Sequence, residues 1–170
     1  MRLQQLNEMS ASEFINLLKG VFEHSPWVAE QAERYRPFST FQSLYDKMVE
    51  IVETASENEK LTLIRMHPHL GTSAKVTDFS QKEQKNAGLN GLTEEERHHL
   101  MSLNQQYIDK FAFPFVMAVR GKTKNDIYAS IQERLKNDYQ TEFQQALEEI
   151  KKIALFRLQE IINERDDFYD

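Results

Sequence analysis

The sequence has 170 residues, of which 40% are hydrophobic and 28% charged, so it suits one folded domain with a buried core rather than a disordered chain. Its formal net charge of -6 makes nucleic acid and anionic membrane surfaces poor electrostatic partners. It contains no cysteine, which excludes disulfides, thiol catalysis and thiolate metal ligands.

The N-terminal residues, MRLQQLNEMSASEF, lack the long apolar core of a signal peptide. No stretch of the sequence approaches the roughly 20 apolar residues that a membrane helix needs. We therefore expect a cytoplasmic protein that binds neither membrane nor nucleic acid.

Helices are expected along most of the chain, because only five Gly and four Pro occur in it. Capping motifs predict helix starts at Ser10-x-x-Glu13, Ser39-x-x-Gln42, Ser56-x-x-Glu59, Ser80-x-x-Glu83 and Thr93-x-x-Glu96. Another start is predicted at Ser25-Pro26-Trp27. Two further helices are expected from about Asn125 and about Thr141, where apolar residues recur at helical spacing.

Two stretches break this pattern. Residues 71–79 read as a loop, and residues 112–119 are apolar without helical spacing and are interrupted by Pro114. The sequence therefore predicts an all-α, single-domain bundle of about eight helices with one buried extended segment at 112–119. This domain would span residues 1–165, and residues 166–170 would form a polar tail.

Arg157 lies inside the apolar stripe of the last predicted helix, on the face that holds Ala154 and Ile161. An arginine at the edge of such a stripe can pack its stem and leave its guanidinium in water. Alternatively, the guanidinium enters a cavity, where burial without a partner is very costly. It would then need a carboxylate from the protein or from a ligand.

His67 precedes Pro68, which ends the helix before it and directs the chain as it leaves. Imidazole is the side chain best matched to proton transfer near neutral pH. The structural alternative is that His67 and His69 are simply solvated loop residues. A metal site with His98 and His99 is weaker, because adjacent histidines on a helix point about 100° apart and no carboxylate is spaced to join them.

Residues 80–84, Ser-Gln-Lys-Glu-Gln, open a predicted helix and form an ordinary capping box. The free N–H groups and positive dipole end of a helix start can also hold an anion. A glutamate at position 83 can take a proton if the site is dry enough. A structural role and a functional role both remain open for this segment.

The backbone of the predicted extended segment has no neighbouring strand in a helical protein. Its buried N–H and C=O groups must therefore bond some other partner. A small ligand that carries N–H and C=O groups of its own is one such partner.

Four motifs occur in order: His67-Pro68-x-Leu70, Ser80-x-x-Glu83-Gln84-x-x-Ala87-Gly88-Leu89, Asn104-x-x-Tyr107-x-x-Lys110-Phe111-x-Phe113-Pro114-Phe115 and Ile153-Ala154-x-x-Arg157-Leu158. Together they resemble the 2-oxo-4-hydroxy-4-carboxy-5-ureidoimidazoline (OHCU) decarboxylase family. The resemblance runs from about Phe14 to about Ile162. The sequence is particularly similar to the N-terminal domain of bacterial bifunctional uricases. The polar tail is therefore interpreted as the start of a linker to a urate oxidase domain.

The resemblance implies an all-helical, cofactor-free, usually dimeric carboxy-lyase that converts OHCU to (S)-allantoin and CO₂ in urate degradation. It implies that His67 and Glu83 are catalytic, with proton-transfer roles that could be exchanged, and it implies no metal ligand. The substrate-binding residues it implies are Pro68, Ser80, Gln81, Lys82, Glu83, Gln84, Phe115, Val116, Met117, Ala118, Val119 and Arg157. One departure is Ala112, where the family commonly has Gly; the added methyl removes no chemical group.

Three alternatives to this activity remain. A non-catalytic helical interaction module would have no enclosed pocket, and would pair Arg157 with a structural carboxylate. A degenerate decarboxylase kept for assembly is disfavoured, because the site residues are intact. A metal hydrolase would depend on the histidines.

Overall fold

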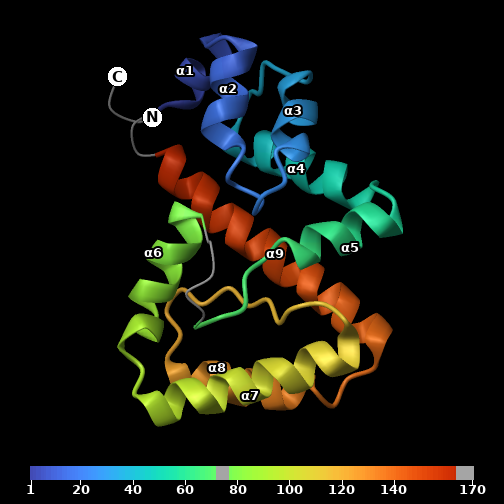
Figure 1. Cartoon of the computed structure of the whole chain (residues 1–170). Coiled ribbons are helices and arrows are strands. Elements are labelled where there is room, and N and C mark those ends of the chain that lie inside the picture. The colour runs from blue at the N-terminus through green and yellow to red at the C-terminus, as the bar shows by residue number, and fades with distance from the viewer. Residues whose placement is uncertain (72–76, 164–170) are drawn as a thin grey trace. The chain divides into compact units, whose positions relative to one another are not determined.

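The computed structural model describes residues 1–71 and 77–163, and within them it is all-helical with no strand (Figure 1). The helices are α1 (Leu3–Glu8), α2 (Ala11–Leu18), α3 (Trp27–Glu33), α4 (Phe41–Glu53), α5 (Glu57–Arg65), α6 (Asp78–Asn86), the 3₁₀ helix η1 (Leu89–Gly91), α7 (Glu94–Phe111), α8 (Lys124–Arg134) and α9 (Tyr139–Ile161). The predicted all-α class is confirmed. The short helices α1 and η1 were not predicted.

The chain divides into two compact units. The first comprises Met1–Leu63 together with the chain from Lys151 onward, and the second comprises Ile64–Ile150. Helix α9 contributes its residues up to Ile150 to the second unit and its remaining turns to the first.

The first unit has a core of large apolar side chains, within which α2 packs on α3 and α3 on α4. Its fully buried members include Leu6, Phe14, Leu18, Phe22, Leu44 and Met48. The guanidinium of Arg36 closes one end of this core by donating to the carbonyls of Leu6 (3.1 Å) and Met9 (2.6 Å). These carbonyls lie at the C-terminal end of α1, where they have no partner inside the helix.

Local capping chemistry explains most of the helix starts. Ser10 accepts a hydrogen bond from the N–H of Glu13, and Thr93 accepts one from Glu96, as predicted. The start predicted at Ser39 is wrong by one residue, because Thr40 and Ser43 form the capping box of α4. Helix α5 ends at Arg65, before Pro68, as expected.

The second unit contains α6, α7, α8 and the first half of α9, with α6 packed on η1 and α7 packed on α8. Between α7 and α8 the chain runs without regular structure, and residues 113–119 of this connection are all buried. The predicted buried segment at 112–119 is therefore confirmed for residues 113–119 and wrong at Ala112, which is exposed and caps the end of α7. Aromatic rings pack around its first residues: Tyr107 and Phe111 from α7 and Phe143 from α9.

Some predictions fall outside the described residues. These are residues 72–76 of the predicted loop at 71–79, and the polar tail at 166–170. Residues 78 and 79 already belong to α6, so the loop prediction is wrong at its end. Among the residues that the structure describes, no helix is long and apolar enough to cross a membrane.

Candidate functional site

His67 lies just after α5, at the start of the second unit, and its side chain is buried. The helical hydrogen-bond pattern stops here, with the N–H of His67 donating to the carbonyl of Ile64 at 3.1 Å. The neighbouring Arg65 side chain donates through Nε to the carbonyl of Ala112 at 3.1 Å. The histidine is thus held at a helix end, and it is not a solvated loop residue.

Helix α6 carries the segment from Ser80 to Gln84, but it begins earlier than predicted. Thr77 is the N-cap, because its hydroxyl accepts the N–H of Ser80 at 3.2 Å. The interpretation of Ser80 as the cap is therefore wrong, and Ser80 lies in the first turn. The error has a simple cause: Thr77 and Ser80 are both good caps and lie three residues apart.

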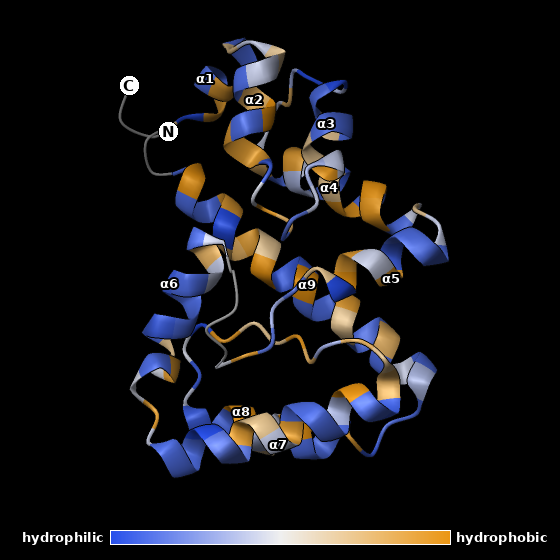
Figure 2. Ribbon diagram, viewed as in Figure 1, coloured by the Kyte–Doolittle hydropathy of each residue, from blue (hydrophilic) through white to orange (hydrophobic). Residues whose placement is uncertain are grey.

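The five residues of this segment differ in burial. Ser80 and Gln84, four residues apart on one face of α6, are buried; Glu83 is partly exposed, and Gln81 and Lys82 are exposed. Helix α6 is mostly hydrophilic (Figure 2), with Phe79 as its one apolar residue. Within this segment, Ser80, Glu83 and Gln84 are therefore the side chains turned toward the protein.

The chain that follows His67 is attached directly to α6. The side-chain oxygen of Gln84 accepts the N–H of Gly71 at 3.0 Å, and Asn104 on α7 donates to the carbonyl of Leu70 at 3.0 Å. Gly71 has φ of +77°, and a Cβ at this position would come within 2.6 Å of Leu100. Glycine is favoured there because its φ is positive and a Cβ would force the Leu100 side chain to shift.

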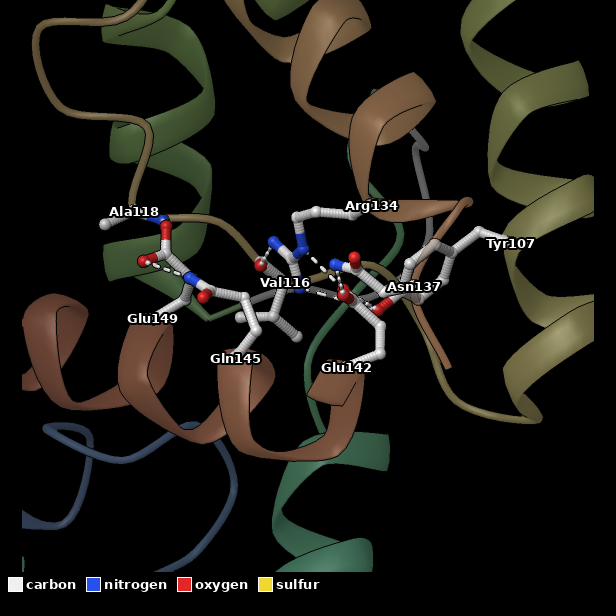
Figure 3. Close-up of polar contacts among 8 residues, drawn as sticks. All are labelled: Tyr107, Val116, Ala118, Arg134, Asn137, Glu142, Gln145 and Glu149. Carbon is white, nitrogen blue, oxygen red and sulfur yellow. Dashed lines mark hydrogen bonds and ion pairs between the residues drawn. The ribbon is translucent and has the colours of Figure 1, made fainter. Parts of the chain in front are cut away.

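The extended segment is held by charged side chains from two helices (Figure 3). Arg134 on α8 donates from Nη1 to the carbonyl of Val116 at 2.6 Å, and the carboxylate of Glu149 on α9 accepts the N–H of Ala118 at 3.3 Å. Both Arg134 and Glu149 are buried. These side chains replace the neighbouring strand that the segment lacks.

A second carboxylate holds Arg134 in place. Glu142, which is wholly buried, forms an ion pair with Nε of Arg134 and accepts the hydroxyl of Tyr107 at 2.5 Å. Asn137 donates to its other oxygen at 3.1 Å. Burial, more than any other influence, raises the pKa of Tyr107, so this hydroxyl stays protonated and remains a donor.

Phe115 and Met117 alternate with these anchored residues and are also buried. No hydrogen bond joins the backbone N–H or C=O of either residue to another part of the chain that the structure describes. In an extended backbone, the polar groups of alternate residues point to opposite sides. Arg134 and Glu149 occupy one side of the segment. The backbone N–H and C=O groups of Phe115 and Met117 therefore lie on the opposite side, where a ligand could bond them.

Arg157 belongs to the first unit, and its side chain is almost completely buried. It donates to the carboxylate of Glu23 at 2.9 Å and to the carbonyl of Gly20 at 3.0 Å. The sequence required a partner for a buried guanidinium, and the structure supplies one from the protein. The interaction-module alternative also predicted this kind of pair.

Within residues 1–71 and 77–163, no three His, Asp or Glu side chains gather as metal ligands do. The metal site considered for His67, His69, His98 and His99 is therefore not formed by the described residues.

Sequence reasoning missed the charged residues that organise the second unit. Tyr107 was noted only as part of a motif, and Arg134, Glu142 and Glu149 were not singled out. A signal was present, since Arg134 lies three residues after the core residue Ile131, and Glu142 precedes the core residue Phe143. A charged residue next to core positions needs a partner, but the partner's identity depends on tertiary structure.

Comparison with known proteins agrees with the motifs. The OHCU decarboxylase family model matches residues 7–159. The "Uric acid degradation bifunctional protein" of Bacillus sp. (strain TB-90) is 72% identical over 167 residues, covering 98% of this chain. This chain spans only 33% of that relative's length. The "2-oxo-4-hydroxy-4-carboxy-5-ureidoimidazoline decarboxylase" of Haloferax volcanii is 40% identical and is matched over 94% of its own length.

Solved structures agree with this assignment. A crystal structure of (S)-allantoin synthase matches 96% of this chain and 54% of its own, with a TM-score of 0.80 and 31% identity. A crystal structure of OHCU decarboxylase in the presence of (S)-allantoin has the same fold, with a TM-score of 0.71. The chain therefore belongs to the OHCU decarboxylase family.

Proposed function

We propose that this chain decarboxylates OHCU to (S)-allantoin and CO₂ in urate degradation, with no cofactor. Family membership supports the reaction class. The structural observation that carries the proposal is the bond between Gly71 and Gln84, which fixes the chain leaving His67 against the helix of Glu83. Both residues assigned to proton transfer thus belong to one compact unit.

The chemistry needs few protein groups. Breaking the bond to the carboxylate releases CO₂ and leaves an electron pair, which moves toward the nitrogen of the adjacent C=N bond, where a proton is taken up. Loss of the hydroxyl proton and protonation of the neighbouring ring carbon then give the ring amide carbonyl of allantoin. The protein must hold the carboxylate out of the ring plane and deliver the last proton to one face.

We assign this proton transfer to His67 and Glu83. Glu83 would accept the substrate hydroxyl proton, and His67 would deliver a proton to the ring, although the reverse assignment uses the same two groups. We assign the substrate contacts of this segment to Ser80, Gln81, Lys82, Glu83 and Gln84, of which Ser80 and Gln84 are buried. Pro68 fixes the direction in which the chain leaves His67.

The segment from Phe115 to Val119 would bind the substrate through its backbone. The ureido group and the ring each carry N–H donors and C=O acceptors, which can bond the groups that Phe115 and Met117 offer. The carbonyl of Val116 and the N–H of Ala118 are already bonded. The carbonyl of Val119 accepts the N–H of Lys122 at 3.0 Å.

Arg157 is proposed to bind an anionic or carbonyl group of the substrate, as the family resemblance implies. A guanidinium can bind two oxygens at once, and Arg157 already holds Glu23 and Gly20. The proposal therefore requires that Arg157 keep, share or exchange these partners when substrate binds. Arg157→Lys would test this role, because lysine keeps the positive charge but lacks the planar guanidinium that can bind two oxygens at once.

We further propose that the protein acts in the cytoplasm as a homodimer, joined to a C-terminal urate oxidase domain. The bifunctional uric acid degradation relatives, of whose length this chain matches 33%, support the fusion. Light scattering of the purified protein would test the dimer.

The test of the activity uses circular dichroism. Urate is oxidised and the product is treated with the hydrolase that forms OHCU, and the allantoin signal is followed with and without this protein. Faster appearance of a single enantiomer supports the proposal, and slow racemic decay in both samples contradicts it. His67→Asn should abolish the acceleration while leaving the far-ultraviolet spectrum unchanged.

A non-catalytic interaction module is the second candidate, because the buried pair of Arg157 and Glu23 is what it predicts. It requires that the wild-type protein not accelerate OHCU decay, and that His67→Asn bind every partner as the wild type does.

A further inference from the structure

We propose that Arg134 and Glu149 are positioning residues for the decarboxylation, acting through the backbone of residues 115–118. This inference rests on the proposed function. The protein anchors one side of the segment, and the other side is left for the substrate. Neither side chain is proposed to touch the substrate.

Arg134 fixes two adjacent residues of the segment at once. Its Nη1 binds the carbonyl of Val116 at 2.6 Å, and its guanidinium carbon lies 4.3 Å from the centre of the Phe115 ring. The ring of Tyr107 packs edge-on against the Phe115 ring from another direction, with 5.3 Å between the ring centres. The peptide between Val116 and Met117, which carries this carbonyl, therefore has little freedom to rotate.

Glu149 fixes the next peptide on the same side. Its Oε1 accepts the N–H of Ala118, and its Oε2 accepts a hydrogen bond from Gln145 one turn earlier on α9 at 3.5 Å (Figure 3). The two anchored groups, on Val116 and Ala118, are two residues apart and so lie on one side of an extended chain. The backbone groups of Met117, between them, are turned to the other side.

The anchors come from different helices but form one electrostatic arrangement. Glu142 neutralises Arg134 and also accepts from Tyr107 and Asn137, so its carboxylate has three donors (Figure 3). A buried guanidinium with this partner cannot swing toward another group without leaving a carboxylate uncompensated. The carbonyl of Val116 is therefore held in one orientation before any substrate arrives.

This arrangement is a form of preorganisation. A segment that is already held in its binding geometry need not be ordered when the substrate binds, so the substrate binds more tightly. If the segment binds the ureido and ring groups of OHCU, its orientation sets the orientation of the ring. Loosening the anchors should then lower kcat/KM without removing any group that transfers a proton.

The sharpest comparison is at position 149. Glu149→Gln keeps an oxygen that can accept the N–H of Ala118, whereas Glu149→Met has a similar length and no such oxygen. We expect Glu149→Gln to retain kcat/KM for OHCU within about threefold, and Glu149→Met to lose at least tenfold. Most of the loss should appear in KM, because substrate binding is impaired and His67 and Glu83 are intact.

Arg134→Lys gives an independent test if the Met variant does not fold. An ammonium is a point donor that lacks the planar fork, so it cannot hold both Glu142 and the Val116 carbonyl in the same geometry. We expect kcat/KM to fall at least tenfold, with the pH profile unchanged. Ile131→Val, a buried change one turn away on α8, is the control for a loss of stability alone, and its KM should not change.

The outcomes separate the two proposals. An inactive wild-type protein contradicts the proposed function itself. An active wild type in which Glu149→Met and Glu149→Gln have equal KM values, or in which Arg134→Lys matches Ile131→Val, contradicts the positioning role.

Discussion

The carboxylate of Glu23 accepts a 2.9 Å hydrogen bond from Arg157, and the two residues lie 134 positions apart in the sequence. Both side chains are almost fully excluded from water. Removing one member of such a pair leaves the other charge buried without compensation. Glu23→Ala should therefore lower the free energy of unfolding by about 3 kcal/mol, measured by urea denaturation at pH 7.

Glu23→Gln should cost less, because an amide oxygen still accepts a hydrogen bond from the guanidinium. Glu30→Gln is the control, since Glu30 is exposed in the same unit and its loss should change stability by less than about 0.5 kcal/mol. A Glu23→Ala protein as stable as the Glu30 variant would show that the pair does not stabilise the fold.

Ala112 ends α7 in the left-handed region, with φ of 60° and ψ of 22°. A residue with a Cβ is strained there by about 1 kcal/mol, whereas glycine is not. A glycine here, which the family resemblance leads us to expect, would avoid this strain. Ala112→Gly should raise the free energy of unfolding by about 0.5–1 kcal/mol, as thermal denaturation would detect.

The matched control is Ala129→Gly, because Ala129 is exposed in the middle of α8. Glycine in a helix interior lowers stability by roughly 0.5–1 kcal/mol. The same substitution should thus change the melting temperature in opposite directions at the two positions. A loss of stability at both positions would refute the strain assigned to Ala112.

The elements that sequence reasoning predicted well are those set by neighbouring residues. The N-cap hydrogen bonds of Ser10 and Thr93 are local, because both partners lie within one turn. Pro114 and an apolar run sufficed to predict the buried extended segment. The start of α6 was wrong because Thr77 competes with Ser80 for the same role.

The elements that could not be predicted depend on distant residues. The sequence shows that a buried Arg157 needs a carboxylate, but many carboxylates are available, and only the fold selects Glu23. The orientation of the 113–119 segment depends likewise on where α8 and α9 place Arg134 and Glu149. Nothing local in the segment distinguishes its anchored side from its other side.

Gln84 joins α6 to the chain that leaves His67, through the N–H of Gly71. Gln84→Leu removes the acceptor at nearly constant volume, so the Gly71 N–H loses its partner. We expect stability to fall by about 1–2 kcal/mol and decarboxylation to slow, because the position of His67 is less fixed. Asn86→Leu changes an exposed residue on the same helix, outside the proposed substrate-binding segment, and should alter neither property by a comparable amount. Equal effects of the two variants would contradict a special role for the Gln84 bond.

The ion pair of Glu96 predicts how the stability of the protein depends on pH. Its carboxylate forms an ion pair with Lys124 and accepts the N–H of Thr93 at 3.0 Å. The hydrogen bond from Lys124, followed by that from the Thr93 backbone, lowers the pKa of Glu96 from 4.5 to about 2. A lowered pKa in the folded state means that folding favours the charged form.

The stabilising effect of Glu96 should therefore be complete above pH 4.5, decline as the pH falls toward 2, and vanish below that value. Glu96→Gln should lower the urea midpoint at pH 7, and its difference from the wild type should shrink steadily between pH 4.5 and 2. Added salt should reduce the difference at pH 7, because the pair lies at the surface. Glu95→Gln, an exposed neighbour, should show no such pH dependence. A Glu96→Gln difference that is as large at pH 2 as at pH 7 would show that this carboxylate does not titrate with folding.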